Sequence, residues 1–346
     1  MIGHSNIEGE IGFVLIGFGR IGQRHFKYLK QNPHARVVAI VDIDEQASKR
    51  DTYPADVPFY TSIQEAVDAK LDFDVVDICT PNGSHCELAL SSLDQGKHTI
   101  IEKPMGLNKA ECESVIYKAL QVSRQVFVVK QNRYSPPSKW LKDVVSKKLL
   151  GDIYSVQINC YWNRNTAYYE PGGWHGTLKQ DGGVLFTQFS HFIDLMYWVF
   201  GDIKNIQTRL KTYKHGAYTE FPDTGTSSFE FVNGGIGMLN FSTAVYQENL
   251  ESSITVIGSK GSLKIGGQYM NEIKYCNIEG YAMPEIEASN APNDYGAYKG
   301  SAANHGEVIS NVINTLHGTD VITANALEGT KVVEIIERIY AAEHGK

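Results

Sequence analysis

The chain has 346 residues, which suits two domains of ordinary size, and 42% of them are hydrophobic, enough for a buried core. Its formal net charge of -7 at pH 7 argues against nucleic acid or an anionic membrane as a general partner. No apolar run approaches membrane-spanning length, and the N-terminal residues carry no signal-peptide pattern. The five cysteines are scattered without metal-ligand spacing. We therefore expect a cytoplasmic protein with reduced thiols and no metal site.

An apolar strand over Phe13–Ile16 runs directly into a glycine-rich turn, and a helix is expected over Gln23–Lys30. The turn consists of Gly17, Phe18, Gly19, Arg20, Ile21 and Gly22, the pattern Gly-x-Gly-x-x-Gly. In a dinucleotide site the first glycine makes the tight turn, the second lets the backbone approach a pyrophosphate, and the third lets helix and strand pack closely. The amides at the start of the helix then face the phosphates. Taken alone, a simple glycine turn would also explain the pattern.

The strand that follows strengthens the dinucleotide interpretation. It covers Val37–Val41 and ends at Asp42, twenty residues after Gly22. A carboxylate there can accept hydrogen bonds from the hydroxyls of the adenosine ribose, and it would repel the 2′-phosphate of NADP. We therefore predict NAD as the cofactor.

Strands and helices alternate through residues 1–130. Strands are expected at 75–79, 98–101 and 126–129, and helices at 63–70, 85–95 and 109–123. Alternation of this kind indicates parallel βαβ units with right-handed crossovers. We predict an α/β fold in which residues 1–130 form an NAD-binding Rossmann domain.

The pattern changes at about residue 131. From 205 to 267 the chain has long strands separated by glycine-rich turns, which predicts antiparallel pairing. Helices are expected at 138–148, 305–315 and 326–343, and a half-buried strand at 154–162. We predict that residues 131–346 form an α+β domain on an open, mainly antiparallel sheet, and that this domain binds the substrate and associates with other copies of the chain.

Ligands of an open parallel sheet bind outside the carboxyl ends of its strands. Three stretches follow predicted strands: Thr80-Pro81-Asn82, Glu102-Lys103-Pro104 and Gln131–Tyr134. Lys103 comes directly after a buried strand, so partial desolvation and nearby cations would lower its pKa and let it hydrogen-bond a reacting hydroxyl. Taken alone, an ordinary solvated lysine at a strand end is the better interpretation.

A second candidate group lies on an apolar helix that follows Gly182-Gly183 and is expected to run to about Phe200. Thr187, His191 and Asp194 are spaced i, i+4 and i+7, so they would share one helix face. Polar groups on such a helix need partners or a cavity, and a histidine can exchange protons near neutral pH. Taken alone, a core histidine bonded to a backbone carbonyl is the better interpretation of His191.

Considered together, these segments resemble the Gfo/Idh/MocA oxidoreductase family over nearly the whole chain. The matching pieces are the glycine turn with His25, Thr80-Pro81-Asn82 with His85, Glu102-Lys103-Pro104, Arg133-Tyr134, and Gly182-Gly183 leading to His191-Phe192-Ile193-Asp194. The resemblance implies that Lys103 and His191 are catalytic and face the nicotinamide and the substrate. It also implies contacts to the nicotinamide side of the cofactor from Pro81, Asn82 and Glu102, and further cofactor contacts from Thr80, His85 and Lys103.

One position departs from the family pattern. Many members carry an aspartate four residues before the histidine, where this chain has Thr187. Threonine cannot accept a proton at neutral pH, so more of the chemistry falls to Lys103 and His191. Together with Tyr168-Tyr169 and Trp174–Thr177, the variant resembles a subgroup of dehydrogenases that oxidise nucleotide-linked amino-sugar uronates at C3 in surface-polysaccharide synthesis.

The resemblance therefore implies an NAD-dependent sugar dehydrogenase. His191 would take the hydroxyl proton as hydride passes to C4 of the nicotinamide, and Lys103 would stabilise the negative charge that develops on the oxygen. The expected substrate contacts are Arg133, Asn163, Arg164, Tyr168, Tyr169, His175, Thr187 and Asp194. We expect a UDP-linked sugar as substrate, and a homodimer or homotetramer assembled through the open sheet.

Three alternatives stay open at this point. The chain could be a dehydrogenase of a free sugar or polyol, a glycosidase that uses bound NAD with no net redox change, or a non-catalytic dinucleotide sensor that contacts a transcription factor. Net formation of NADH would separate a dehydrogenase from the glycosidase, and the presence of both Lys103 and His191 argues against the sensor. For Tyr168 and Tyr169, simple packing is an equally good interpretation.

Overall fold

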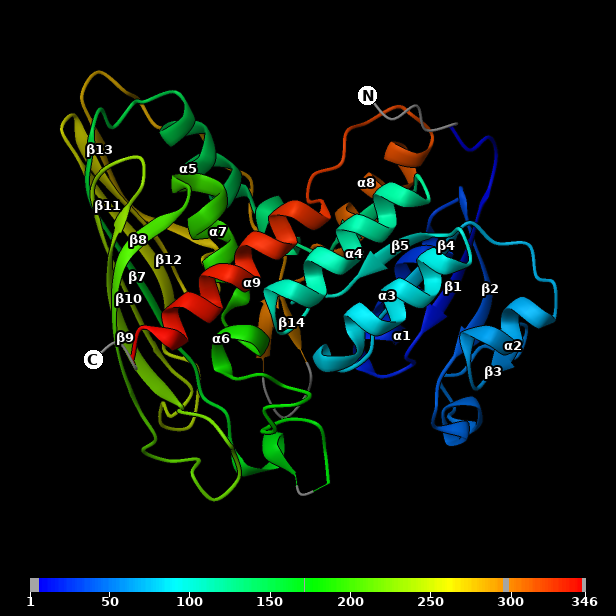
Figure 1. Ribbon diagram of the computed structural model, residues 1–346. Helices are drawn as coiled ribbons and strands as arrows, with labels where there is room; N and C mark the ends of the chain where they lie inside the picture. Colours follow the sequence, from blue (N-terminus) through cyan, green and yellow to red (C-terminus); the bar gives the residue numbers. More distant parts are fainter. Residues whose placement is uncertain (1–5, 171, 295–298, 344–346) are drawn as a thin grey trace. The chain divides into compact units, whose positions relative to one another are not determined.

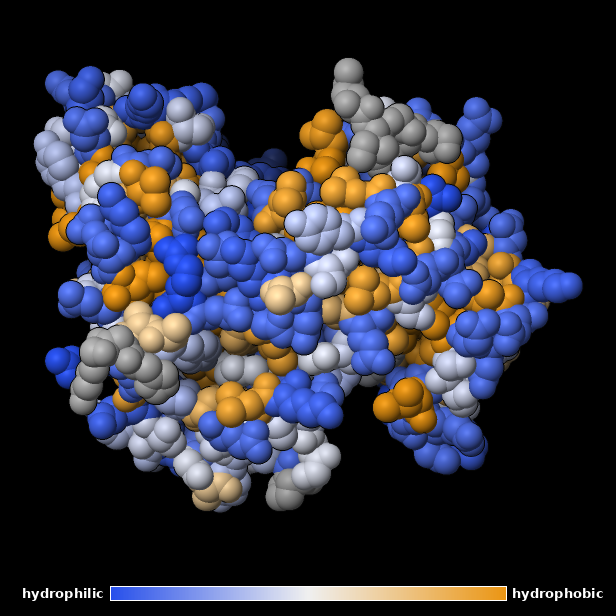
Figure 2. All heavy atoms as spheres, in the orientation of Figure 1, coloured by the Kyte–Doolittle hydropathy of each residue, from blue (hydrophilic) through white to orange (hydrophobic). Residues whose placement is uncertain are grey.

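The computed structural model describes residues 6–170, 172–294 and 299–343 (Figure 1). The chain groups into two compact units. The first contains the described residues up to Val129 together with His305–Val333, and the second contains Lys130–Asn304 together with the residues from Glu334 onward. No helix within the described ranges combines enough length with enough apolar character to cross a lipid bilayer. On the face shown in Figure 2, hydrophobic residues are interspersed with hydrophilic ones.

Six parallel strands form the sheet of the first unit, in the order β3-β2-β1-β4-β5-β6. They are β1 (Ile11–Ile16), β2 (Ala35–Val41), β3 (Phe59–Tyr60), β4 (Val75–Ile78), β5 (His98–Ile101) and β6 (Val126–Val128). Strands β1, β4 and β5 are buried along their whole length, as expected for parallel strands covered on both faces. This strand order is that of a Rossmann fold, so the predicted parallel sheet is confirmed.

Helices connect these strands and begin and end at local signals. They are α1 (Arg20–Gln31), α2 (Ile63–Asp68), α3 (His85–Asp94) and α4 (Lys109–Gln121), with short 3-10 helices η1 (Glu45–Lys49) and η2 (Asn82–Ser84). The side chain of Asn108 accepts the Glu111 N–H at 2.9 Å and caps the start of α4. Gly96, with a φ of +68°, follows the end of α3 in the left-handed conformation that favours glycine.

A late segment of the chain completes the first unit. Helix α8 (His305–Leu316) packs against α1, and the Val128 N–H donates to the Ala324 carbonyl at 3.0 Å. Helix α9 (Ala326–Ala341) contributes its residues up to Val333. The sequence carries no sign of this return, because an amphipathic pattern does not say which sheet a helix covers. The predicted division at residue 130 places His305–Val333 in the second domain, whereas these residues group with the first unit. The boundaries of the two functional domains stay a prediction.

Seven strands form the sheet of the second unit, in the order β13-β12-β11-β7-β10-β9-β8. They are β7 (Ile153–Tyr161), β8 (Ile203–Lys211), β9 (Thr224–Phe231), β10 (Ile236–Ser242), β11 (Glu251–Gly258), β12 (Gly261–Gly266) and β13 (Glu272–Ile278). The β7–β10 pairing is parallel and the other five are antiparallel. Gly234 and Gly235, with φ of +101° and +88°, make the turn between β9 and β10. The predicted open, mainly antiparallel sheet is confirmed.

One face of this sheet is covered by helices α5 (Pro136–Ser146) and α7 (Ser190–Phe200) (Figure 1). The unit also contains η3 (Gln131–Tyr134), η4 (Thr166–Tyr169), α6 (Val184–Thr187) and the short pair β14 (Pro292–Asp294) and β15 (Lys299–Ala302). Trp162 is central to the core between sheet and helices: its ring lies 5.4 Å from that of Phe189 and 5.6 Å from that of Phe192, and its indole N–H donates to Ser252 at 2.8 Å.

The helix that we expected to run unbroken to Phe200 is interrupted. Helix α6 ends at Thr187 and α7 begins at Ser190, with Phe189 at φ −108° and ψ 1° between them. Phe189 turns into the core there, with its ring 6.1 Å from that of Phe241. Thus His191 and Asp194 share α7, and the prediction that Thr187 lies on the same helix face is wrong.

Candidate active site

The glycine turn has the geometry that a pyrophosphate site needs. Gly17 has a φ of +90°, and a Cβ there would lie 2.6 Å from the Cys79 carbonyl oxygen. A Cβ on Gly22 would lie 1.8 Å from the Gly17 carbonyl oxygen, so only glycine lets α1 approach β1 this closely. A Cβ on Gly19 would meet no protein atom within 4 Å, which leaves the N-terminus of α1 open to a ligand. These features fit the phosphates of a dinucleotide.

Asp42 is held beside this turn at the end of β2. Its Oδ2 accepts the Phe18 N–H at 2.7 Å, and its Oδ1 accepts the Asp44 N–H at 2.9 Å. Each carboxylate oxygen keeps a second lone pair for a ribose hydroxyl. The nearby Arg50 donates to the Phe18 carbonyl and to Asp44, each at 2.9 Å, so its charge is already engaged. The arrangement fits an adenosine ribose without a 2′-phosphate.

Two loops that follow strands β4 and β5 are tied together by His85. Its Nδ1 lies 2.7 Å from the Pro104 carbonyl oxygen and its Nε2 lies 2.9 Å from the Thr80 carbonyl oxygen. The side chain is buried, and burial lowers its pKa. His85 therefore orders the cofactor-side loops from behind, and a direct contact to the cofactor stays a prediction, as it does for the buried Asn82 in η2.

Lys103 follows β5 and is half-buried, and its peptide bond to Pro104 is cis. The carboxylate of Glu102 accepts the Lys103 backbone N–H at 2.9 Å and lies 3.0 Å from Nε2 of His25. Burial alone would raise the pKa of Glu102, but the hydrogen bond from His25 and the nearby ring of His305 hold that pKa well below its ordinary range. Glu102 is thus an anion turned inward to the protein. Sequence reasoning named Glu102 and His25 but missed His305, which comes from a distant helix.

His191 lies on the first turn of α7 and is 6% exposed. Its Nε2 lies 3.3 Å from the hydroxyl of Ser301, which accepts a hydrogen bond of 3.2 Å from Gln131. Both Ser301 and Gln131 reach this position with their side chains. A ring in such surroundings can exchange a proton with a hydroxyl group.

Arg133 and Asp194, both predicted as substrate contacts, bind each other. Nε and one terminal nitrogen of Arg133 donate to the two carboxylate oxygens of Asp194 at 2.9 and 2.8 Å, and both side chains are 1% exposed. Lys130 Nζ lies 3.6 Å from the same carboxylate. Burial would raise the pKa of Asp194, but these two cations lower it. The pair joins η3 to α7, and a direct role for either residue in substrate binding stays a prediction.

The structure also shows what Thr187 does in place of an aspartate. Its hydroxyl donates to the carboxylate and the carbonyl oxygen of Asp181, which is fully buried. The other carboxylate oxygen of Asp181 accepts the Gly176 N–H at 2.8 Å and lies 3.7 Å from Nδ1 of His175. A carboxylate is therefore present beside Thr187, supplied from the preceding loop. Sequence reasoning missed Asp181, although it directly precedes the Gly182-Gly183 motif.

The remaining predicted substrate residues form a stack of planar groups. The ring of His175 lies 3.7 Å from that of Trp174 and 4.1 Å from that of Tyr168. The guanidinium of Arg164 lies 5.1 Å from the centroid of the Tyr168 ring, and the Tyr168 hydroxyl accepts a hydrogen bond of 2.8 Å from Gln188. His175 and Trp174 are half-buried and the others buried. The exposed end of the stack can pack against a planar or ring-shaped ligand.

Two further predicted contacts have mainly structural surroundings. Asn163 donates from its side chain to the Val245 carbonyl, and its backbone N–H donates to Asn249 at 2.9 Å. Tyr169 is 2% exposed with its ring 5.1 Å from that of His215, and burial raises the pKa of its phenol. Both environments favour packing, and their contact with substrate stays a prediction.

Comparison with known proteins gives matches over both parts of the chain. Residues 11–130 match the "Oxidoreductase family, NAD-binding Rossmann fold" of the Gfo/Idh/MocA proteins, and residues 139–264 match the "GFO/IDH/MocA C-terminal domain". Among curated proteins, inositol 2-dehydrogenase of Rhizobium meliloti is 24% identical over 282 residues, covering 80% of this chain and 82% of its own length.

Two solved structures are similar over nearly the full length. The WlbA dehydrogenase of Chromobacterium violaceum, in complex with NADH and UDP-GlcNAcA, is 32% identical, with a TM-score of 0.89 and coverage of 99% of this chain and 97% of that one. The WlbA dehydrogenase of Bordetella pertussis, in complex with the same two molecules, is 27% identical, with a TM-score of 0.86 and coverage of 97% of each chain.

Proposed function

Because the chain belongs to the Gfo/Idh/MocA family and is an NAD-dependent sugar oxidoreductase, we propose that its substrate is a nucleotide-linked amino-sugar uronate, oxidised at C3. One observation carries the proposal: the full-length similarity, at 32% identity, to a dehydrogenase whose structure holds NADH and UDP-GlcNAcA. The stack of Trp174, His175 and Tyr168 and the buried cation of Arg164 support it, since a sugar nucleotide offers a planar base and anionic groups. Such a substrate would place the enzyme in the cytoplasm, in polysaccharide synthesis.

In the proposed mechanism His191 is the general base. Oxidation of a secondary alcohol removes a proton from oxygen as hydride leaves carbon, so a neutral base is needed. A histidine is mostly neutral above about pH 6.5. Bound NAD supplies the hydride acceptor. Lys103 hydrogen-bonds the same substrate oxygen and stabilises its developing negative charge.

The remaining proposed site residues bind and orient. The turn from Gly17 to Gly22 holds the pyrophosphate, and Asp42 holds the adenosine ribose. Thr80, Pro81 and Asn82 form the loop on the nicotinamide side. Of the eight predicted substrate residues, we propose direct contacts for Arg164, Tyr168 and His175. The other five, Arg133, Asn163, Tyr169, Thr187 and Asp194, support the walls of the site.

The test of substrate class is a panel of sugars incubated with NAD. We expect reduced NAD with UDP-GlcNAcA and little with free glucose or inositol. Robust turnover of a free polyol, with none for nucleotide sugars, would refute the proposed substrate in favour of a polyol dehydrogenase. Glycoside cleavage without net NADH would indicate the glycosidase, and NAD binding with no turnover of any sugar would indicate a sensor.

The test of the two catalytic residues is a pair of variants, Lys103→Ala and His191→Ala. Each should lower turnover on the order of 100-fold or more, the usual scale for acid–base groups. NAD affinity should change little, because binding rests on the glycine turn and Asp42. Near-normal turnover in either variant would remove that residue from the mechanism, and failure of His191→Ala to fold would indicate a core histidine.

We further propose that a second copy of the chain covers the open face of the second unit's sheet. Ile236 and Ile257, which are 62% and 46% exposed, flank Ser155 in one row across β10, β7 and β11. In the next row Met238, 43% exposed, lies beside Gln157. Exposed apolar side chains on a broad flat sheet favour association.

A row of hydrogen-bonded polar side chains crosses the same face and would determine how the two copies align. Thr226 donates to Asn240 at 2.8 Å, Asn240 to Asn159 at 3.0 Å, and Asn159 to Glu251 at 3.3 Å, and Lys264 Nζ lies 3.6 Å from Glu251. The test is sedimentation of the wild type and of Ile236→Lys. We expect a dimer or tetramer that the substitution dissociates, with Tyr117→Lys on the exposed face of α4 as an unaffected control. A monomeric wild type would refute this proposal.

A further inference from the structure

A cluster of titratable side chains is buried in the first unit, behind the loop that carries Lys103. Each member comes from a different element or its end, and none is more than 4% exposed: His25 on α1, Asp77 on β4, Glu102 after β5 and His305 on α8. Helix α1 is the helix whose N-terminus lies at the glycine turn. The cluster thus joins the cofactor-binding helix to the strand end that carries Lys103.

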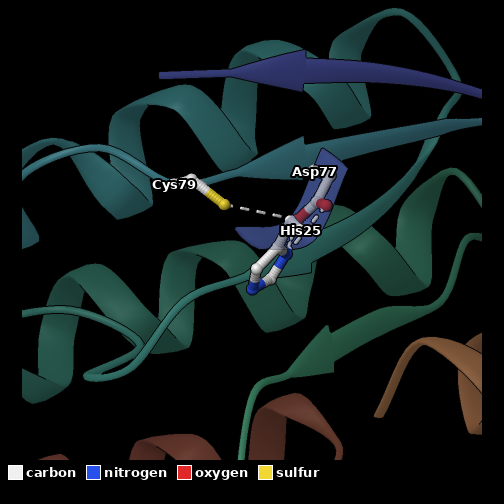
Figure 3. Close-up of side chains that lie close together, drawn as sticks. All are labelled: His25, Asp77 and Cys79. Atoms are coloured by element: carbon white, nitrogen blue, oxygen red, sulfur yellow. Dashed lines mark hydrogen bonds and ion pairs between the residues drawn. The ribbon is translucent and has the colours of Figure 1, made fainter. Parts of the chain in front are cut away.

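His25 lies between two carboxylates. Its Nδ1 is 3.0 and 2.9 Å from the two oxygens of Asp77, and its Nε2 is 3.0 Å from Oε1 of Glu102. Figure 3 shows the His25 and Asp77 side chains pointing at each other, with Cys79 beside them. Ionised carboxylates only accept hydrogen bonds, so both ring nitrogens of His25 must donate. A ring that donates from both nitrogens is an imidazolium.

The other groups that face His25 leave this charge assignment in place. Cys79 donates to Asp77 across 3.8 Å, and burial raises the pKa of its thiol, so it stays protonated. His305 Nε2 lies 3.4 Å from Glu102; burial lowers the pKa of His305 against the effect of Glu102, and the charges of His25 and Arg24 add to the lowering. Burial would also lower the pKa of His25, but the Asp77 carboxylate outweighs it and raises that pKa well above its ordinary value.

Glu102 connects the cluster to the site. Its Oε1 faces His25, while its Oε2 accepts the backbone N–H of Lys103 at 2.9 Å. If His25 lost its charge, the neutral ring could donate a hydrogen bond to only one of the two buried carboxylates. The other carboxylate would stay buried without the hydrogen bond from His25 that offsets its loss of hydration. Glu102 would then shift, and the backbone of Lys103 with it.

We propose that His25 is a positioning residue for Lys103: as a protonated imidazolium it fixes Glu102, and Glu102 fixes the Lys103 backbone. The inference rests on the proposed catalytic role of Lys103. A displacement of about 1 Å at a catalytic group can cost on the order of 100-fold in rate. The cluster would therefore set turnover while leaving cofactor binding nearly unchanged.

The first test observes the proton itself. In the full chain with NAD bound and histidine rings labelled with 15N, the His25 signal is assigned by its absence in His25→Asn. We expect both ring nitrogens to be protonated at about pH 8, well above the ordinary histidine pKa of about 6.5. A ring with one unprotonated nitrogen at neutral pH would overturn the proposal. So would a metal-bound signal, since the His25, Glu102 and His305 ligand atoms lie within 4.8 Å of one another.

The second test separates positioning from mere stability. His25→Asn should lower kcat by about 10- to 100-fold and change the Kd for NAD by less than about threefold. The matched control is Thr99→Val on β5, which removes a buried hydrogen bond of 2.9 Å to Ser92 and has no contact with Glu102 among those described. It should leave both constants near the wild-type values. Equal effects of the two substitutions on kcat would overturn the proposal.

A conservative variant keeps the proposal falsifiable if His25→Asn fails to fold. Glu102→Gln can still accept the Lys103 N–H through its oxygen and offers an NH₂ group to a neutral His25. We expect kcat within about tenfold of wild type, because the Lys103 N–H keeps its acceptor. A fall of 100-fold or more, the loss expected for Lys103→Ala, would overturn the proposal. If Lys103→Ala keeps full activity, the proposed function fails instead, whatever the protonation state of His25.

Discussion

Replacing Asp194 by alanine tests whether this residue serves the fold or the substrate. The substitution removes two charge-assisted hydrogen bonds of 2.9 and 2.8 Å and leaves the Arg133 guanidinium buried at 1% exposure, with Lys130 close by. Breaking a buried ion pair on one side costs about 3–5 kcal/mol, because the remaining charge stays buried without its partner. Total stabilities are about 5–15 kcal/mol. We therefore expect a large fall in the free energy of unfolding, with a melting temperature lower by roughly 10 °C.

The assay is urea unfolding followed by circular dichroism, beside Asp143→Ala as control. Asp143 forms an ion pair of 2.8 Å with Lys147 within one helix, but the two side chains are 50% and 62% exposed. Solvent screens such a pair, so its loss should leave the free energy of unfolding nearly unchanged. If Asp194→Ala destabilised the protein by less than about 1 kcal/mol, the structural role assigned to the Arg133–Asp194 pair would be wrong, and Asp194 would be available to the substrate.

Three further predictions concern the cofactor site and pH. Asp42→Ala should narrow the preference for NAD over NADP, because the charge that repels the 2′-phosphate is gone; a wild type that prefers NADP would contradict this assignment. Gly19→Ala should weaken NAD binding at least tenfold (about 1.4 kcal/mol) with unchanged stability, since its Cβ meets no protein atom within 4 Å. Gly22→Ala should lose both NAD binding and stability, because its Cβ would clash with the Gly17 carbonyl oxygen. Equal stability of the two variants would refute the packing argument. The pKa values of Glu102 and Asp194 are lower in the folded protein than in the unfolded chain, so their ionised forms stabilise the fold. This stabilisation is fully present above the ordinary carboxyl pKa of about 4, and it is lost as pH falls through the pKa values of the folded state. Urea unfolding as a function of pH should therefore show stability falling on the acid side, and wild-type stability that stayed flat below about pH 4 would contradict the prediction.

Much of the first sheet could be predicted because its signals are local. The glycine turn, the strand that ends at Asp42 and the cap at Asn108 each act within a few residues of chain, and alternation of strands and helices leaves few topologies. The second sheet was predictable only as a class. Its one parallel pairing joins β7 to β10, which are separated by 74 residues between Tyr161 and Ile236, and no local pattern specifies such a partner.

The site was harder to predict because its charged side chains pair with residues that are far away in the sequence. The sequence predicts both Arg133 and Asp194 as substrate contacts, yet they lie 61 positions apart and bind each other. The interruption between α6 and α7 follows from Phe189 packing into the core, a tertiary effect that overrides a helical pattern. The same holds for Asp181, whose carboxylate reaches Thr187 from the preceding loop.

The most direct test of the proposed reaction follows a deuterium atom from C3 of UDP-GlcNAcA. The substrate is labelled there, mixed with NAD and a stoichiometric amount of enzyme, and the reduced cofactor is analysed by mass spectrometry after a single turnover. The proposed function predicts that the deuterium appears in the reduced nicotinamide. Formation of unlabelled NADH would show that another carbon is oxidised, and no reduction of NAD would contradict the assignment of this substrate.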